Sequence, residues 1–219
     1  MAQFDADLDK LVDLFAEDLH QMSKGERTRL KIMASAAKVF NEKGFSETSI
    51  QEIAKNAGVA KGTVYYYVDK KEDLVLMLAQ FSRARLFSKI ERAFARATTA
   101  SEKLEAVIRS HLKVIKIVGP IMPFFVLNIV KEDSRLRRVI ANFRGHYLSI
   151  LESIIEEGIN SGEFRKVDPK KTAVAILGLV IGQLIQYRVF TATGKFNTKA
   201  IAETTLGIAL HGLRRGDES

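Results

Sequence analysis

The sequence of 219 residues predicts an all-α protein on three observations. Apolar residues recur at spacings of three and four along most of the chain, which is the period of a helix with one buried face. Signals that end or start a helix separate these stretches, as at Gly44, Gly58 and the Asp168-Pro169 pair. Only three prolines occur, at positions 120, 123 and 169, so long helices can form without interruption.

Residues 1–23 are expected to form an extra amphipathic helix ahead of the first domain. Five aspartates and the lack of a continuous apolar run in residues 1–20 argue against a secretory signal peptide. The helix packs on its own subunit or crosses to a partner chain, and the sequence leaves both open. Its apolar stripe consists of Phe4, Leu8, Leu11, Val12, Phe15, Leu19 and Met22.

Residues 47–71 predict two short helices joined by a tight turn, which is a helix-turn-helix. Thr48 or Ser49 can cap the first helix, and Glu52 stands three residues after Ser49, the spacing of a capping box. Gly58 ends that helix, because glycine tolerates a left-handed backbone. The inward positions are Ile50, Ile53, Ala54, Ala57, Val64 and Tyr67 or Val68. A preceding helix that ends at Gly44, after a polar link over residues 22–26, completes a three-helix unit.

The second helix of the pair, expected from Lys61 to Val68, has an outward face without an acidic residue. That face carries a cation, a bare backbone, a hydroxyl and two phenols: Lys61, Gly62, Thr63, Tyr65 and Tyr66. A DNA major groove admits an α-helix, and such groups can approach phosphates and base edges. The net charge of +8 and the pI of about 9.6 also favour a polyanionic partner. A solvated helical hairpin is the alternative interpretation.

Residues 27–78 resemble the DNA-binding domain of the tetracycline-repressor (TetR/AcrR) family. The matching positions run in order through Ile32, Ala36, Phe40, Gly44-Phe45, Thr48-Ser49-Ile50, Ile53-Ala54, Ala57-Gly58-Val59, Lys61-Gly62-Thr63-Val64-Tyr65-Tyr66 and Lys71-Glu72-Asp73-Leu74. Ala60 departs from a common serine, and Tyr67-Val68 departs from a histidine followed by phenylalanine. The resemblance implies a homodimeric transcriptional regulator on a near-palindromic double-stranded DNA operator. The expected DNA-binding residues are Thr48, Ser49, Gln51, Lys61, Gly62, Thr63, Tyr65, Tyr66 and Lys71.

The domain boundaries follow from this resemblance. Residues 24–71 are expected to form the DNA-binding domain, and residues 72–219 an effector-binding and dimerisation domain. A long helix from Lys70, with Asp69 as its N-cap, joins the two. Further helices are expected at residues 102–118 with Ser101 as the cap, at 134–160, at 169–190 and at 197–213.

The last two expected helices are apolar on nearly every face, so they must be buried on every face. Gly178 and Gly182 would allow close helix contact. In the family that the chain resembles, the last two helices build the homodimer interface. We therefore expect the chain to be a homodimer through residues 169–213.

The resemblance also implies a small-molecule effector bound between helices of the second domain. The burial pattern selects as candidate ligand-binding residues His111, Ile115, Met122, Phe125, Ile129, Phe143, Tyr147, Gln183 and Tyr187. Plain core packing is the alternative for each. Such an aliphatic and aromatic wall favours a hydrophobic effector over a sugar or nucleotide. The cavity is expected along Pro120–Val130, and the expected function is a repressor released from its operator by the effector.

Several function classes find no support in the sequence. The four histidines show no metal-ligand spacing, and no catalytic or nucleotide-binding glycine motif occurs, so neither an enzyme nor a metal or cofactor site is expected. The absence of cysteine fits a reducing cytoplasm. The apolar run at 124–130 is too short to span a membrane. The alternative function is a sequence-non-specific architectural DNA-binding protein without an effector.

Overall fold

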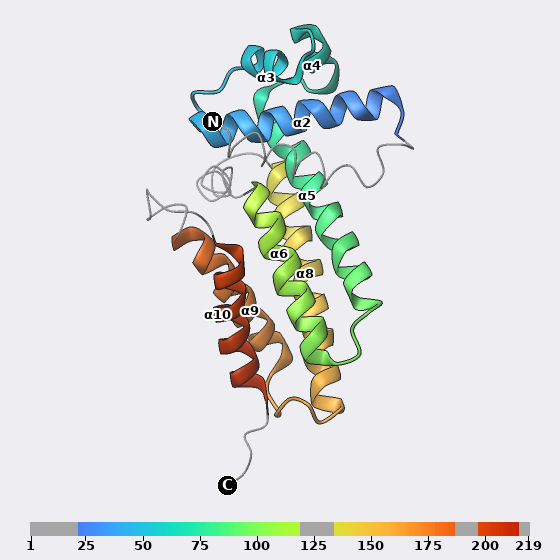
Figure 1. Ribbon diagram of the computed structural model, residues 1–219, viewed down its shortest axis with the longest axis vertical. Helices are drawn as coiled ribbons and strands as arrows, with labels where there is room; N and C mark the ends of the chain where they lie inside the picture. The colour runs from blue at the N-terminus through green and yellow to red at the C-terminus, as the bar shows by residue number, and fades with distance from the viewer. Residues whose placement is uncertain (1–21, 119–133, 187–196, 215–219) are drawn as a thin grey trace.

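The computed structural model describes residues 22–118, 134–186 and 197–214. The described residues form eight α-helices, with a small three-helix unit at one end and a longer helical bundle extending from it (Figure 1). The all-α prediction is confirmed. None of the described helices combines the length and apolar character needed to cross a membrane. Residues 1–21 of the expected N-terminal helix and the expected cavity segment Pro120–Val130 lie outside the described residues.

The small unit consists of α2 (Lys24–Lys43), α3 (Ile50–Ala57) and α4 (Lys61–Tyr67). The polar link expected over residues 22–26 is wrong, because Ser23 and Glu26 form a capping box that starts α2 at Lys24. The backbone N–H of Ser23 donates to the Glu26 carboxylate at 2.8 Å, and the N–H of Glu26 donates to the Ser23 hydroxyl at 3.3 Å. Helix α2 ends at Gly44, as expected.

The helix-turn-helix is confirmed in its details. Gly58 adopts the left-handed conformation, with φ 66° and ψ 35°. Ser49 is the N-cap of α3, and its hydroxyl accepts the backbone N–H of Glu52 at 3.2 Å. Ala60 is the N-cap of α4 and supplies no side-chain hydrogen bond there. The buried hydroxyl of Ser35 on α2 donates to the Ile53 carbonyl at 2.7 Å, which fastens α3 to α2.

Helix α5 (Lys71–Phe94) leaves the small unit and runs into the bundle (Figure 1). The expectation that Asp69 caps this helix is wrong. The carboxylate of Asp73 instead accepts the backbone N–H groups of Asp69 at 3.1 Å and Lys70 at 3.0 Å, so the helix begins at Lys71. The early turns of α5 belong to the core of the small unit, through Leu74, Val75, Met77 and Leu78, and its later turns to the core of the bundle, through Leu86 and Ile90.

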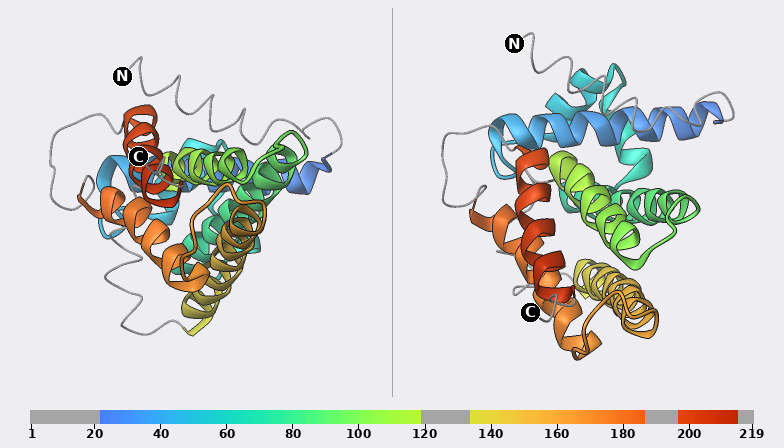
Figure 2. Two further views of the ribbon diagram at one scale, coloured as in Figure 1. Left: turned by 90° about the horizontal axis from the view of Figure 1, so that it is seen from below. Right: turned by 60° about the horizontal axis from the view of Figure 1, so that its bottom comes forward.

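The bundle is completed by α6 (Ala100–Val118), α8 (Ser134–Asn160), α9 (Pro169–Ile185) and α10 (Thr198–Leu213). Helices α9 and α10 lie side by side in each direction of view (Figure 2). Helix α8 also reaches the small unit. Its Leu136 is part of that core, and its Arg135 pairs with Asp73 at 2.8 Å.

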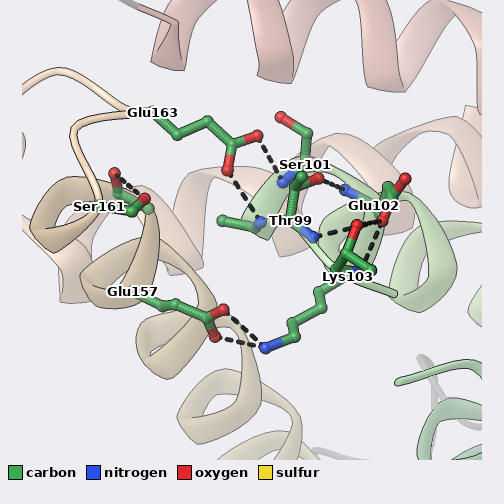
Figure 3. Close-up of polar contacts among 10 residues, drawn as sticks. Thr99, Ser101, Glu102, Lys103, Glu157, Ser161 and Glu163 are labelled. Atoms are coloured by element: carbon green, nitrogen blue, oxygen red, sulfur yellow. Dashed lines mark hydrogen bonds and ion pairs between the residues drawn. The ribbon is translucent and has the colours of Figure 1, made fainter. Parts of the chain in front are cut away.

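The far end of the bundle is fastened by polar contacts to the first turn of α6 (Figure 3). The expectation that Ser101 caps α6 is wrong, because α6 already begins at Ala100. The hydroxyl of Thr99 accepts the N–H of Glu102 at 3.2 Å, and the Glu102 carboxylate accepts the N–H of Thr99 at 3.2 Å. Glu163, in the connection between α8 and α9, accepts the N–H groups of Ala100 at 2.9 Å and Ser101 at 3.0 Å.

The same connection packs tightly against the bundle. Phe164 is 1% exposed, and a Cβ atom built on Gly158 of α8 would lie 2.2 Å from its ring. Phe164 also pairs with Arg214 after α10 in an isolated antiparallel bridge. Asp168 caps α9 with Pro169 at its first turn, as expected. Asn197, expected as the start of the last helix, is the N-cap of α10.

Candidate nucleic-acid interface and effector cluster

The outward face of α4 is open to solvent. Lys61 and Gly62 are exposed, Tyr65 is 46% exposed and Tyr66 is 83% exposed. A Cβ atom on Gly62 would meet nothing within 4 Å, so the backbone there is accessible. The inward face rests on Val64, which is fully buried. A tyrosine as exposed as Tyr66 gains no burial energy in this chain, so the fold does not explain its presence.

Two ring contacts lie within α4, and one hydrogen bond joins it to α2. The ammonium of Lys61 lies 5.8 Å from the centre of the Tyr65 ring. The Tyr66 and Tyr67 rings meet edge to face at 5.1 Å. The Tyr67 hydroxyl donates to the carbonyl of Gly25 at 3.0 Å, which ties α4 to the first turn of α2. Tyr67 is therefore a structural residue, while Tyr65 and Tyr66 remain available to a partner.

The start of α3 is held by charge as well as by its cap. The carboxylate of Glu52 accepts the N–H of Ser49 at 3.1 Å and pairs with Lys43 at the end of α2. The hydrogen bond from Lys43, together with those from Ser49, lowers the pKa of Glu52 to about 2. The expected DNA-binding residue Ser49 is thus occupied as a cap, and the expected Gln51 lies exposed in the first turn of α3.

Two further expected DNA-binding residues serve the fold in this structure. The Thr48 side chain is buried, and its hydroxyl donates to the Gly44 carbonyl at 2.7 Å. The ammonium of Lys71 donates to the carbonyls of Phe45 at 2.6 Å, Ser46 at 3.2 Å and Thr48 at 2.8 Å. An ammonium has three N–H donors, so these acceptors match its capacity. Lys71 therefore joins the start of α5 to the loop between α2 and α3.

The structure brings together three of the expected ligand-binding residues. His111 of α6 lies 4.6 Å from Tyr147 of α8 and 5.7 Å from Phe143, measured between ring centres. Phe143 and Tyr147 are stacked at 5.8 Å. Phe87 of α5, which the sequence analysis did not select, lies 5.9 Å from Phe143. We call His111, Phe143, Tyr147 and Phe87 the aromatic cluster, and it touches three helices.

Two members of the aromatic cluster bury polar atoms without a partner. The Nδ1 atom of His111 and the hydroxyl of Tyr147 form no hydrogen bond within the described part of the chain. Burial lowers the pKa of His111 to about 4 and raises the pKa of Tyr147 above its usual range. Both side chains are therefore neutral near pH 7.

The remaining expected ligand-binding residues cannot be placed beside these. Met122, Phe125, Ile129 and Tyr187 lie outside the described residues, and so does the side chain of Ile115. Gln183 is half-buried on α9. No group of three or more potential metal ligands occurs in the described ranges.

A groove of about 290 Å³ lies elsewhere, between α2 and α5. Its lining includes Leu30 and Met33 of α2 with Met77 and Phe81 of α5, and it ends at Met22. The groove sits at the joint of the small unit and the bundle, away from the aromatic cluster. No local pattern in the sequence indicates this groove, because its two walls are more than forty residues apart in the chain.

Helices α9 and α10 leave a second surface of small and apolar residues exposed. Val174 is 47% exposed and Ile208 is 53% exposed. Gly178 and Gly182 on α9 and Gly207 on α10 are also exposed, and a Cβ atom on each would meet nothing within 4 Å. We call these five residues the α9–α10 face. No described residue approaches Gly178 or Gly182 closely, so the close helix contact expected there remains a prediction for the interface between two copies.

Known proteins share both halves of this architecture. The chain matches the model of the bacterial regulatory proteins of the tetR family over residues 32–78, and that of the tetracyclin repressor-like C-terminal domain over residues 97–213. The fatty acid metabolism regulator protein of Bacillus subtilis (strain 168) is 31% identical over 152 residues, which are 69% of this chain and 78% of the relative.

Solved structures of other proteins have a similar fold over most of this chain. The fatty acid degradation regulator FadR from Bacillus halodurans has a TM-score of 0.72 and 26% identity, and the match covers 86% of this chain and 97% of that one. FadR from Bacillus subtilis, in complex with stearoyl-CoA, has a TM-score of 0.66 and 28% identity over 84% and 98% of the two chains. The helix-turn-helix, the helical second domain and these matches together show that the chain belongs to the tetR family of bacterial regulatory proteins, and that it is a DNA-binding transcriptional regulator.

Proposed function

We propose that this regulator is a repressor that binds a near-palindromic operator as a homodimer and is released by a long-chain acyl-CoA. The single observation that carries the DNA-binding part is the outward face of α4, where two exposed tyrosines, a lysine and an open glycine backbone stand together without an acidic group. The relative named as a fatty acid metabolism regulator, and the one solved with stearoyl-CoA, support the effector class.

The DNA-binding part is tested by selecting bound sequences from a random DNA pool. The affinity of the protein for the selected sequence is then measured over a salt series. Tyr66→Ala is expected to lower operator affinity at least tenfold without lowering the melting temperature, because the ring is exposed. Lys61→Ala is expected to reduce the salt slope by about one unit if its ammonium neutralises one phosphate. Lys113→Ala on α6 removes an exposed lysine of the bundle and should change neither quantity.

A selection that returns no common sequence would contradict the repressor and favour the architectural alternative. Thr48, Ser49 and Lys71 are poor test residues, since their side chains support the unit itself. Loss of DNA binding in those variants would report damage to the fold. Tyr65 and Thr63 complete the set of α4 residues proposed to contact DNA.

The dimer part rests on the α9–α10 face. An isolated subunit leaves Val174 and Ile208 about half exposed, and apposed copies of this face would bury them by two-fold symmetry. Gly182→Arg is the test, because the open space around Gly182 lets an isolated subunit fold with the new side chain. Light scattering is expected to show a wild-type dimer and a monomeric variant. A monomeric wild type at micromolar concentration would refute the dimer.

The release part rests on the position of the aromatic cluster. Phe87 lies on α5, whose first turn carries Lys71, and Phe143 lies on α8, whose start is bound to Asp73 through Arg135. A ligand that rearranges the cluster can therefore act on the small unit through two helices. Such a shift requires that the ligand bind the two states with different affinity.

Operator titrations with and without ligand test the release. Stearoyl-CoA is expected to weaken operator binding, and coenzyme A alone is expected to leave it unchanged. By linkage, operator DNA should weaken stearoyl-CoA binding by the same factor. Equal operator affinity with and without saturating stearoyl-CoA would refute the proposed effector.

A further inference from the structure

The two unpartnered polar atoms of the aromatic cluster are an anomaly in an otherwise well-packed domain. His111 is 6% exposed and Tyr147 is fully buried, yet Nδ1 of the first and the hydroxyl of the second form no hydrogen bond with the residues that the structure describes. Leaving such a group buried and unsatisfied lowers the stability of the fold. A phenylalanine in place of Tyr147 would avoid that cost, so the fold itself does not require the hydroxyl.

The position of these atoms points to a shared partner. Their rings are 4.6 Å apart and come from different helices, α6 and α8. Phe143 closes one side of the pair through contacts with both rings. A small polar group placed between the helices could therefore meet both atoms while its apolar remainder contacts the aromatic rings.

The protonation states restrict the chemistry of that group. A buried phenol that stays protonated is a hydrogen-bond donor. A neutral imidazole presents either a donor or an acceptor at Nδ1 and adds no charge. A carboxylate or phosphate buried here would lack a cation from this pair, whereas an uncharged carbonyl oxygen can accept from the phenol and from the Nδ1–H tautomer of the imidazole.

We propose that the His111 Nδ1–H and the Tyr147 hydroxyl donate hydrogen bonds to the carbonyl oxygen of the effector's acyl thioester. This inference rests on the proposed function, since it assigns the atoms that recognise the acyl-CoA. It makes His111 and Tyr147 the polar end of an otherwise apolar site, and it gives the protein a means to distinguish a thioester from a plain hydrocarbon.

The first experiment compares two ligands that differ only in the carbonyl oxygen of the thioester. Stearoyl-CoA and octadecyl-CoA, the thioether that lacks only the carbonyl oxygen, are titrated against the full-length protein by calorimetry. The wild type is expected to bind the thioester about ten times more tightly, the ratio that hydrogen bonds of this kind provide. In Tyr147→Phe this preference should shrink to about threefold or less, because one of two donors is gone.

The protein side uses the same substitution at two tyrosines. In the ligand-free protein, Tyr147→Phe is expected to keep or raise the melting temperature, since it removes an unsatisfied group. Tyr67→Phe is the matched control, because its hydroxyl has a partner in Gly25. That variant should lower the melting temperature and leave the preference for the thioester at its wild-type value.

Three outcomes separate the possible failures. If the wild type binds both ligands but without preference, the carbonyl assignment is overturned and the acyl-CoA effector survives. If Tyr147→Phe lowers the ligand-free melting temperature as much as Tyr67→Phe does, the hydroxyl has a structural partner and the assignment is also overturned. If neither ligand binds the wild type, both the proposed acyl-CoA effector and the thioester assignment are refuted.

Discussion

The helix-turn-helix unit and the bundle treat buried polar groups in opposite ways. In the unit, the buried hydroxyls of Ser35 and Thr48 both donate to backbone carbonyls. In the bundle, the polar atoms of His111, Tyr147 and Thr205 are buried without a partner within the described ranges. Within the described residues, the fold therefore satisfies these two hydroxyls of the unit and leaves these three groups of the bundle unsatisfied.

This difference matches two kinds of recognition. On the proposed function, DNA binds to an exposed face, so the unit beneath that face can be rigid and complete before DNA binds. A ligand enclosed between helices must supply contacts that the empty bundle lacks. On the proposed function, the unsatisfied groups lower the stability of the ligand-free bundle until the effector binds them.

The largest expected effect is a pH dependence that comes from His111. Its pKa is about 4 in the folded chain and 6.5 when unfolded, so the unfolded state binds more protons between these values and stability falls as pH drops from 6.5 to 4. The loss should reach about 3 kcal/mol at the bottom of this window. His111→Leu should flatten the pH profile of urea unfolding across this interval. Parallel profiles for the two proteins would contradict the burial of a neutral imidazole.

The next effect concerns the far end of the bundle, where packing is tight. Gly158→Ala would place a methyl group 2.2 Å from the Phe164 ring and is expected to cost about 1–3 kcal/mol of unfolding free energy. Gly145→Ala on the same helix meets open space and should stabilise by about 1 kcal/mol. Thermal unfolding of the two variants should shift in opposite directions. Two shifts of melting temperature with the same sign would show that the Phe164 ring can move aside at little energetic cost.

The smallest expected change in unfolding free energy comes from removing one buried hydroxyl in each region. Ser35→Ala breaks the bond to the Ile53 carbonyl and should cost about 1 kcal/mol. Thr205→Val keeps the shape of a side chain that is 1% exposed and removes a hydroxyl without a partner, so stability should stay the same or rise. Denaturant midpoints measure both. An equal loss in the two variants would remove the distinction between the regions.

Local sequence signals predicted most of the helix ends. Gly44, Gly58, Ser49 and the Asp168-Pro169 pair act as expected, because each works within one turn of its own helix. Two local signals were misread. Ser23 with Glu26, and Thr99 with Glu102, have the spacing of a capping box and mark the true starts of α2 and α6.

The contacts that were beyond sequence reasoning join distant parts of the chain. Lys71 was expected on DNA, but its ammonium meets carbonyls 23 to 26 residues away. Glu163 caps a helix that starts 63 residues earlier. The sequence indicated that His111 and Tyr147 are buried, but only the packing of α6 on α8 shows that their polar atoms have no partner there.

The division of α5 between two cores limits how this regulator can be recombined with others. A hybrid joined at residue 71 would give the foreign half the four buried side chains that complete the core of the small unit, Leu74, Val75, Met77 and Leu78. A joint between Leu78 and Leu86 keeps each set with its own partners. Even then the small unit needs Leu136 and Arg135, which arrive from α8. A designed biosensor that exchanges the sensing half must therefore carry over the start of α8 along with the helix-turn-helix.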